Sequence, residues 1–429
     1  MNSKEKSSAV VDEGATLVPK LRFPEFQDAP AWKPISLRKA SVPVDERVGE
    51  RKLTPVSISA GIGFVPQAEK FGRDISGNQY QLYTLVRDGD FVFNKGNSLK
   101  FPQGCIYLLE GWGEVAAPNV FIAFRLKDNY SNGFFQNCFE QNQHGKQLKR
   151  HITSGARGNG LLNISKETFF GVEIPTPSLP EQQKIADCLA SADALIEVQG
   201  RKVEALKAHK TGLMQQLFPQ EGETQPRLRF PEFEGTGDWV EQSVGDFGQV
   251  VTGSTPSTTD PSLYGGGIPF VSPADISELR YVDETKTTLT AAGFQKTRPI
   301  RAGSVLFVCI GSTIGKIAQN VRDCATNQQI NAVIPNVRHS GGFVYFALSN
   351  ATDRITLLAG KQAVPIINKS LFSSVRLLVP GLPEQERISD CLTTIDDFIT
   401  AETRKLDTLK THKKGLMQKL FPAIEELQL

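Results

Sequence analysis

The chain has 429 residues and a formal net charge of only +2. This length exceeds what one typical core can bury, so we expect two or three domains. The small net charge excludes the strongly basic composition of proteins that coat nucleic acid, so any DNA contact must be local. We find no apolar signal core at the N-terminus and no window that approaches a membrane span.

The chain begins with a polar segment and a short motif that recurs later. Residues 1–16 are rich in Lys, Ser and Glu, which predicts a disordered N-terminus. The motif Leu-Arg-Phe-Pro-Glu-Phe at 21–26, followed by Trp32, recurs at 228–233, followed by Trp239. We therefore expect two related halves, each opened by this motif.

Each opening motif leads into a region of short β-type runs, glycine turns and aromatic residues. Examples are the runs 91–93, 105–109, 305–308 and 375–379. The pattern predicts two α+β domains, at 17–178 and 227–381, built on mixed or antiparallel sheets with short helices. Both contain a strand that runs into a Gly-polar turn, at 89–98 and at 303–313. The two domains are expected to share a fold and to differ at their loop tips.

Each domain is followed by a copy of one long helical segment, at 179–219 and 382–422, and more than half of the aligned positions are identical. Apolar residues recur at 4,3 spacing through five heptads, which predicts an antiparallel coiled coil rather than two ordinary amphipathic core helices. A linker at 220–226 and a tail at 423–429 complete the chain. The predicted interface comprises Ile185, Leu189, Ile196, Gln199, Val203, Leu206, Leu213, Leu217, Ile388, Leu392, Ile395, Ile399, Glu402, Leu406, Leu409, Leu416 and Leu420.

We call the predicted helix–helix interface the seam. Polar residues interrupt the seam at matching positions of the two helices. Gln199 and Glu402 lie near the middles of the two helices, where an antiparallel pair would bring them together and fix its register. Gly212 and Gly415 also match, and a repeated helix-weakening glycine predicts close approach of another backbone. A helix from 181 to 217 would be roughly 55 Å long. That exceeds one turn of B-DNA, about 34 Å, so the helices could act as a spacer between two domains on one duplex.

Candidate DNA-reading residues follow from side-chain chemistry. Asn and Gln pair with adenine, Arg and Lys with guanine or phosphate, and Ser and Thr with either bases or phosphates. For each residue the alternative is an ordinary solvated loop side chain. The candidates are Lys95, Asn97, Ser98, Lys100, Lys149, Arg150 and Arg157 in the first domain, and Ser254, Thr255, Ser257, Ser312, Thr313, Lys316, Asn327, Gln328, Gln329 and Lys361 in the second.

Motifs for catalysis are missing from the sequence. The segment 311–316 has one residue too few between its glycines for a phosphate-binding loop, and Ile317 replaces the required Ser or Thr. The five histidines lack metal-ligand spacing, and no Cys-x-x-Cys pair is present. We find neither a nucleophile elbow nor a dinucleotide fingerprint. The chain is therefore expected to be non-catalytic, with no metal or cofactor of its own.

The combination of motifs resembles the specificity subunit of type I restriction–modification systems. The resemblance rests on the twin LPEQ…GLMQxLFP helices, the LRFPEF…W openings, and Gly253–Ser257 followed by Tyr264–Ile276. It implies that two target-recognition domains each read one half of a split, asymmetric DNA sequence, while the helices set the gap and dock two methyltransferase subunits. It also implies restriction subunits as partners, with S-adenosylmethionine, ATP and Mg on the partner subunits. The implied location is the bacterial or archaeal cytoplasm, with the nucleoid.

Three alternatives stay open at this point. The chain could serve a methylation-only complex or another restriction architecture. It could be a coiled-coil scaffold that binds no DNA. It could also be a stand-alone enzyme, although no catalytic motif supports that interpretation.

Overall fold

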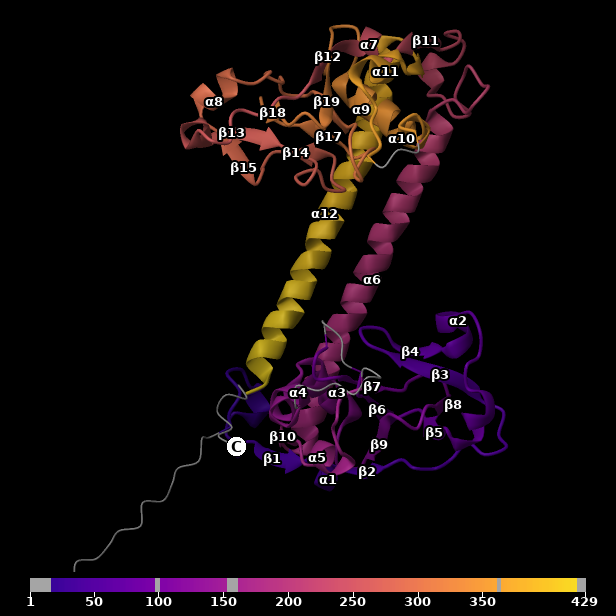
Figure 1. Cartoon of the computed structure of the whole chain (residues 1–429), viewed down its shortest axis with the longest axis vertical. Helices are drawn as coiled ribbons and strands as arrows, with labels where there is room; N and C mark the ends of the chain where they lie inside the picture. The colour runs from indigo at the N-terminus through magenta and orange to yellow at the C-terminus, as the bar shows by residue number, and fades with distance from the viewer. Residues whose placement is uncertain (1–16, 97–100, 153–160, 361–363, 423–429) are drawn as a thin grey trace, which may run out of the picture. The chain divides into compact units, whose positions relative to one another are not determined.

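The computed structural model describes residues 17–96, 101–152, 161–360 and 364–422. The predicted N-terminal segment 1–16 and tail 423–429 lie outside these residues. The chain forms two compact units (Figure 1). Unit 1 contains the residues up to Glu197 and those from Thr408 onward, and unit 2 runs from Val198 to Asp407. Both long helices, α6 (Leu179–Leu217) and α12 (Leu382–Leu420), are therefore divided between the units.

Two four-stranded sheets form the body of unit 1. The first has the order β4-β3-β8-β5, with β3 (Thr54–Ser59), β4 (Gly63–Pro66), β5 (Thr84–Arg87) and β8 (Glu114–Ala117). The second has the order β2-β9-β6-β7, with β2 (Ser41–Pro43), β6 (Asp90–Asn94), β7 (Cys105–Leu108) and β9 (Ile122–Leu126). The β3–β8 pair is parallel and the other pairs are antiparallel, so the unit contains mixed pairing.

The apolar sequence of β6 accounts for its position as a buried central strand. All five of its residues are buried, and alternate side chains point to opposite faces. Phe91 and Phe93 pack in the main core of the unit, whereas Val92 packs in a smaller core on the other face. The main core also receives short helices: α1 (Leu37–Ala40), α3 (Asn132–Glu140), α4 (Gln143–Leu148) and α5 (Lys166–Phe170). Helix α2 (Gln67–Phe71) and the 3-10 turns η1 (Pro24–Phe26), η2 (Gly77–Leu82) and η3 (Lys149–His151) complete the unit.

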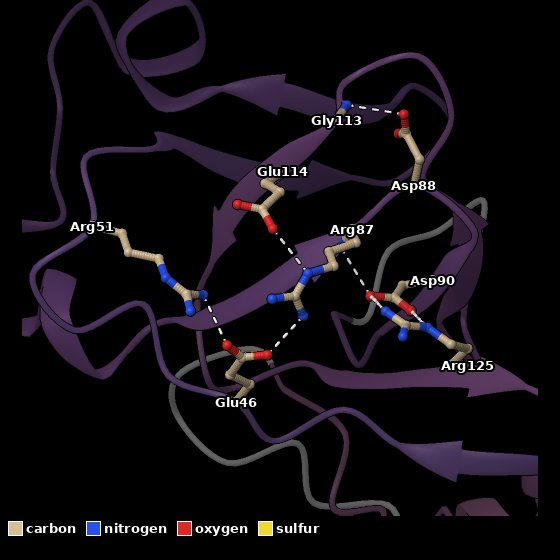
Figure 2. Close-up of polar contacts among 8 residues, drawn as sticks. All are labelled: Glu46, Arg51, Arg87, Asp88, Asp90, Gly113, Glu114 and Arg125. Carbon is tan, nitrogen blue, oxygen red and sulfur yellow. Dashed lines mark hydrogen bonds and ion pairs between the residues drawn. The ribbon is translucent and has the colours of Figure 1, made fainter.

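A network of charged side chains connects the two sheets of unit 1 (Figure 2). The buried carboxylate of Asp90 accepts hydrogen bonds from the Arg87 backbone N at 2.8 Å and from Arg125 Nε at 2.6 Å. Arg87 lies on β5 and Arg125 on β9, so one carboxylate joins both sheets. The Arg87 guanidinium also donates to Glu46 at 2.7 Å and to Glu114 at 2.8 Å. These arginines are thus paired with carboxylates.

Unit 2 is built on a five-stranded and a three-stranded sheet. The first has the order β12-β19-β16-β17-β14, with β12 (Gly248–Thr252), β14 (Tyr281–Val282), β16 (Val305–Val308), β17 (Ile317–Asn320) and β19 (Ile330–Pro335). The second has the order β15-β13-β18, with β13 (Tyr264–Val271), β15 (Thr287–Leu289) and β18 (Ala325–Thr326). The β14–β17 and β13–β18 pairs are parallel, and the others are antiparallel.

The core of unit 2 follows the same plan as that of unit 1. Strand β16 is fully buried, with Val305 and Phe307 on one face and Leu306 and Val308 on the other. Helix α9 (Gly341–Asn350) covers the first face, as Figure 1 shows, and is buried along most of its length. The unit also contains α7 (Val244–Phe247), α8 (Ala291–Gln295), α10 (Thr352–Leu357), α11 (Lys369–Ser374), η4 (Pro231–Phe233) and η5 (Pro261–Leu263). The predicted α+β class with mixed sheets and short helices is confirmed.

A two-stranded antiparallel ribbon precedes each long helix. In unit 1 β1 (Lys33–Ser36) pairs with β10 (Glu173–Thr176), and in unit 2 β11 (Val240–Ser243) pairs with β20 (Arg376–Val379). Each ribbon joins the strand after the opening motif to the strand before the helix. The beginning and end of each predicted domain are therefore held together where the helix starts.

Candidate nucleic-acid interface

The opening motif of unit 1 is fastened to the first turn of α6 by a buried ion pair. Arg22 donates from Nε to Glu181 Oε1 at 2.8 Å and from Nη2 to Oε2 at 2.7 Å. The indole of Trp32 donates to the same Oε1 at 3.2 Å. The side chains of Arg22 and Glu181 are only 8% and 1% exposed, so the carboxylate exchanges water for three protein donors. We call Arg22, Trp32 and Glu181 the unit 1 anchor.

Unit 2 repeats this arrangement with Arg229, Trp239 and Glu384, the unit 2 anchor. Arg229 donates from Nε and Nη2 to the two carboxylate oxygens of Glu384, both at 2.8 Å, and Trp239 donates to Oε1 at 3.4 Å. The hydrogen bond to the carboxylate raises the pKa of the arginine in both anchors. In each unit the opening motif therefore contacts the first turn of the long helix that follows. Each anchor fixes that helix to the globular core of its own unit.

The far end of the other long helix packs beside each anchor. In unit 1 the backbone N of Leu21 donates to Lys419 O of α12 at 2.9 Å, and the Trp32 and Phe421 ring centroids are 6.1 Å apart. In unit 2 Leu228 N donates to Gln216 O of α6 at 2.9 Å, and the ring centroids of Trp239 and Phe218 are 6.0 Å apart. Each core is thus completed by the start of one long helix and the end of the other.

Within each unit the two helices run antiparallel. In unit 2 Gln199 Nε2 donates to Glu402 Oε2 at 2.6 Å, and Lys202 Nζ donates to Oε1 at 2.6 Å. Lys210, further along α6, pairs with Asp396, earlier on α12, at 2.6 Å. The structure therefore brings Gln199 and Glu402 together, as the matching polar positions indicated. In unit 1 the repeat-matched Lys413 pairs with Asp193 at 2.7 Å.

The predicted seam residues are all buried or half-buried, but they serve two kinds of contact. The middle positions Gln199 and Glu402 contact each other across the helical pair. The end positions pack in the globular cores: Ile185, Leu189, Leu416 and Leu420 in unit 1, and Leu213, Leu217, Ile388 and Leu392 in unit 2. The prediction for Gly212 and Gly415 is wrong, because a Cβ built at either position meets nothing within 4 Å.

Three polar segments of unit 2 that are distant in sequence converge on one surface. Thr255 Oγ1 donates to Gln328 Oε1 at 2.6 Å, which joins the segment after β12 to the segment after β18. Gln329 Nε2 donates to Ile310 O at 3.3 Å, which adds the segment after β16. We call residues 252–257, 310–316 and 326–329 the reading cluster, after the predicted DNA-reading candidates that they contain. It contains every described second-domain candidate of the predicted set.

Glycines permit the close approach of these segments. At Gly253 a Cβ would lie 2.1 Å from Asn327 O, so only glycine fits between the strand ends. Gly311 has a φ of +95° and lies under Gln329, whose Nε2 would be 3.4 Å from a Cβ. The polar side chains are consequently held on a shaped surface rather than on independent loops.

The candidates in the reading cluster differ in availability. Thr255, Ser257, Ser312 and Gln328 are exposed, whereas Ser254, Thr313, Asn327 and Gln329 are half-buried. Lys316 is exposed as a whole residue, but its ammonium donates to Ile276 O at 2.9 Å and to Pro273 O at 3.3 Å. It therefore stabilises the neighbouring 273–276 turn. Lys361 lies outside the described residues.

One cation of this surface was missed by sequence reasoning. Arg298 is exposed, and its Nη1 donates to Thr252 O at 2.8 Å while its backbone N donates to Ser254 Oγ at 3.2 Å. These contacts hold the guanidinium beside the reading cluster. Arg298 lies between a helix and a proline in an unremarkable stretch, and no local pattern marks it.

The first-domain candidates fall into two groups. Asn97, Ser98, Lys100 and Arg157 lie outside the described residues. Lys95 directly follows β6 and is half-buried, and its carbonyl accepts a hydrogen bond from Leu162 N at 2.8 Å. Lys149 and Arg150 are exposed in η3, just after α4. The sequence places all three at the borders of the segments that carry the other four.

Burial shifts the pKa of several titratable groups in the cores. Burial lowers the pKa of His144 to about 4, and its ring packs against Phe93 and Phe139. Burial also raises the pKa of Cys309 and of Cys324 to about 12. Among the described residues there is no group of three His, Cys, Asp or Glu that could hold a metal ion, and no helix long and apolar enough to cross a membrane.

Each unit thus combines an anchor of the same residue types with polar loops of different sequence. The sequence model of one family, described as the type I restriction modification DNA specificity domain, matches residues 78–208 and 236–411. The chain therefore belongs to the family of type I restriction–modification specificity proteins.

Individual proteins are similar to this chain in part of their sequence or in their fold. The chain is 31% identical over 148 residues to the HindI specificity subunit of Haemophilus influenzae, an alignment that covers 33% of this chain and 32% of that relative. Its fold is similar to the S subunit of M. genitalium, with a TM-score of 0.60 at 14% identity, over 95% of this chain and 100% of the other. A chain from a type I restriction–modification complex gives a TM-score of 0.53 at 19% identity, over 91% and 98%.

Proposed function

We propose that each unit reads one half of a bipartite, asymmetric DNA target, and that α6 and α12 set the distance between the halves. The observation that carries this proposal is the contrast between the anchors and the loops. The two anchors match in residue type and in donor–acceptor pattern, whereas the polar loops on the two units differ in sequence. A matching support with different contact surfaces fits a protein that reads two different half-sites.

The reading cluster has the chemistry of base recognition. The exposed amide of Gln328 can pair with adenine, and the hydroxyls of Ser254 and Thr255 can reach bases or phosphates. The amides of Asn327 and Gln329 hydrogen-bond within the cluster and hold its shape. The residues of the cluster include no Asp or Glu, so they do not repel the DNA backbone. In unit 1 the exposed Lys149 and Arg150 supply phosphate contacts that fix position without reading sequence.

The long helices are proposed to dock two methyltransferase subunits. Their surfaces are near-duplicates, so equal partners can bind equal sites. Leu195 on α6 and Phe398 on α12 occupy matching repeat positions and are 58% and 57% exposed. Large apolar side chains exposed at equivalent places support a protein contact at each.

The chemistry of the complex would reside on the partners. We propose that this chain is non-catalytic, that the methyltransferase subunits carry S-adenosylmethionine, and that restriction subunits supply the steps that need ATP and Mg. Modification of chromosomal DNA would place the assembly in the cytoplasm, with the nucleoid.

A binding assay on the assembled complex tests the proposal. Gln328→Ala should weaken binding to the recognised duplex by about 1–3 kcal/mol, the value of one amide–base pair. Gln249→Ala is the matched control, because Gln249 is exposed on β12 where that strand pairs with the far end of β19. Equal losses for both variants, or a complex that binds all duplexes equally, would contradict the proposal.

A further inference from the structure

Four large aliphatic side chains are exposed on one border of the reading cluster. Leu357 is 82% exposed, Val364 is 53% exposed, and Leu358 and Ile366 are each 44% exposed. We call these residues the apolar rim. Scattered exposed aliphatics are ordinary in proteins, but a group of four beside a polar contact surface indicates a function.

Backbone contacts fix the apolar rim against the segment 310–316. Gly311 N donates to Pro365 O at 3.0 Å, and Ile366 pairs with Ile310 in an antiparallel bridge. The end of α10 lies against the same segment, because a Cβ on Gly315 would be only 2.7 Å from Thr356 Cγ2. Both stretches that carry the rim therefore border this segment of the reading cluster.

The rim is continuous with the amides of the cluster. Ile310, the bridge partner of Ile366, accepts a hydrogen bond from the side chain of Gln329. Asn327 Nδ2 in turn donates to Gln329 Oε1 at 3.0 Å. The segments 252–257, 310–316, 326–329 and 364–367 contain no Asp or Glu. Amide and aliphatic groups thus lie next to each other on segments without carboxylates, and Asp353 lies in the first turn of α10, the helix that ends at Leu357.

An amide next to an aliphatic side chain complements the major-groove edge of an A·T pair. Adenine offers an N7 acceptor and an N6 donor that suit an amide, and thymine offers a C5-methyl group that suits an aliphatic side chain. A G·C pair has no methyl group on this edge. An amide beside an aliphatic side chain therefore distinguishes A·T from G·C by both partners of the pair.

We propose that the apolar rim contacts thymine C5-methyl groups, so that it reads A·T pairs together with the amides of the reading cluster. This inference rests on the proposed function, because it names which base-pair feature the surface of unit 2 recognises. The partner is DNA rather than protein, since the rim is continuous with the amides of the reading cluster, whose segments contain no Asp or Glu.

The test replaces each thymine of the recognised sequence, one at a time, by deoxyuridine, which removes only the methyl group. Binding of the assembled complex is measured for the wild type, for Val364→Ser with Ile366→Ser, and for the control Val337→Ser, because serine carries no methyl group that could contact thymine. Val337 is 93% exposed and lies outside the rim and the reading cluster. One buried methyl group corresponds to roughly a fourfold change in Kd.

We expect the wild type to bind roughly fourfold more weakly when deoxyuridine replaces a thymine at one or more positions within a single half-site. The rim variant should bind the thymine and uracil duplexes equally, and Val337→Ser should behave as the wild type. Specific wild-type binding that is indifferent to every uracil substitution would overturn the rim proposal and leave the proposed function intact. A rim variant that fails to assemble, with no uracil effect in the wild type, would assign the rim to a protein contact. Wild-type binding without sequence preference would overturn the proposed function itself.

Discussion

The anchors give a prediction whose magnitude follows from burial. Glu181→Ala leaves the guanidinium of Arg22 without its carboxylate in a site where that side chain is 8% exposed. Removal of one partner of a buried pair costs about 3–5 kcal/mol. We expect the lower end, about 3 kcal/mol, because Arg22 also donates to the carbonyls of Ala29 and Pro30, the latter at the surface. The indole of Trp32 loses its acceptor as well.

The chain supplies a control in the same place. Lys184 and Glu25 form an ion pair at 3.0 Å beside the unit 1 anchor, with side chains 50% and 45% exposed. Exposed pairs contribute little because water screens them. Unit 2 repeats this pair as Arg387 and Glu232 at 3.1 Å. The repeat therefore contains an inner and an outer ion pair that differ mainly in burial.

Urea unfolding of the four variants Glu181→Ala, Glu384→Ala, Glu25→Ala and Glu232→Ala measures the difference. Hydrogen exchange, resolved by peptide, shows which unit is affected. Both inner variants should lose stability by similar amounts, each mainly in its own unit, and both outer variants should stay close to the wild type. Equal losses for inner and outer pairs, or a Glu181→Ala variant with unchanged stability, would refute the reasoning that the anchors hold the helices to the cores.

Three further outcomes are expected. Charge reversal of Lys149 and Arg150 should weaken DNA binding and reduce the slope of log K against log salt by about 2, and an unchanged slope would remove both residues from the footprint. The pKa of His144 is about 4 in the folded chain against 6.5 when unperturbed, so the unfolded state binds more protons between these values, and stability should fall by about 3 kcal/mol as pH drops from 6.5 to 4. His144→Phe should flatten that dependence in urea titrations at several pH values, and a dependence of unchanged size would contradict the assignment. Gln199→Leu removes the donor to Glu402 Oε2 and should lower the thermal midpoint, and an unchanged midpoint would show that Lys202 alone satisfies the Glu402 carboxylate.

The sequence predicted the helices and their covered face well. Heptad spacing is a local pattern, and every seam position from Ile185 to Leu420 is buried or half-buried. The pattern could not show that the seam ends enter the globular cores, because apolar spacing is the same for a helix partner and for a sheet. The glycines Gly212 and Gly415 misled for a related reason, since helix propensity says nothing about the space around a residue.

The contacts that matter most connect residues that are far apart in sequence. Arg22 and Glu181 are separated by 159 positions, and both repeats were visible without any sign that they meet. The reading cluster likewise depends on Thr255 reaching Gln328, 73 positions away. Side-chain chemistry identified these polar loops as candidates, but only the strand order brings their tips together. Arg298 was missed for the same reason. It lies 44 positions from Ser254, so no local motif links it to the cluster.

The central claim is that one chain reads two half-sites through two dissimilar loop surfaces. The most direct measurement is sequencing of methylated bases in host DNA with the wild-type gene, without it, and with Thr255→Ala and Gln328→Ala in the reading cluster. The account predicts a bipartite methylated motif that depends on the gene, and a variant that alters one half while the other half and the gap stay unchanged. A motif without a gap, changes in both halves, or methylation that persists without the gene would contradict it.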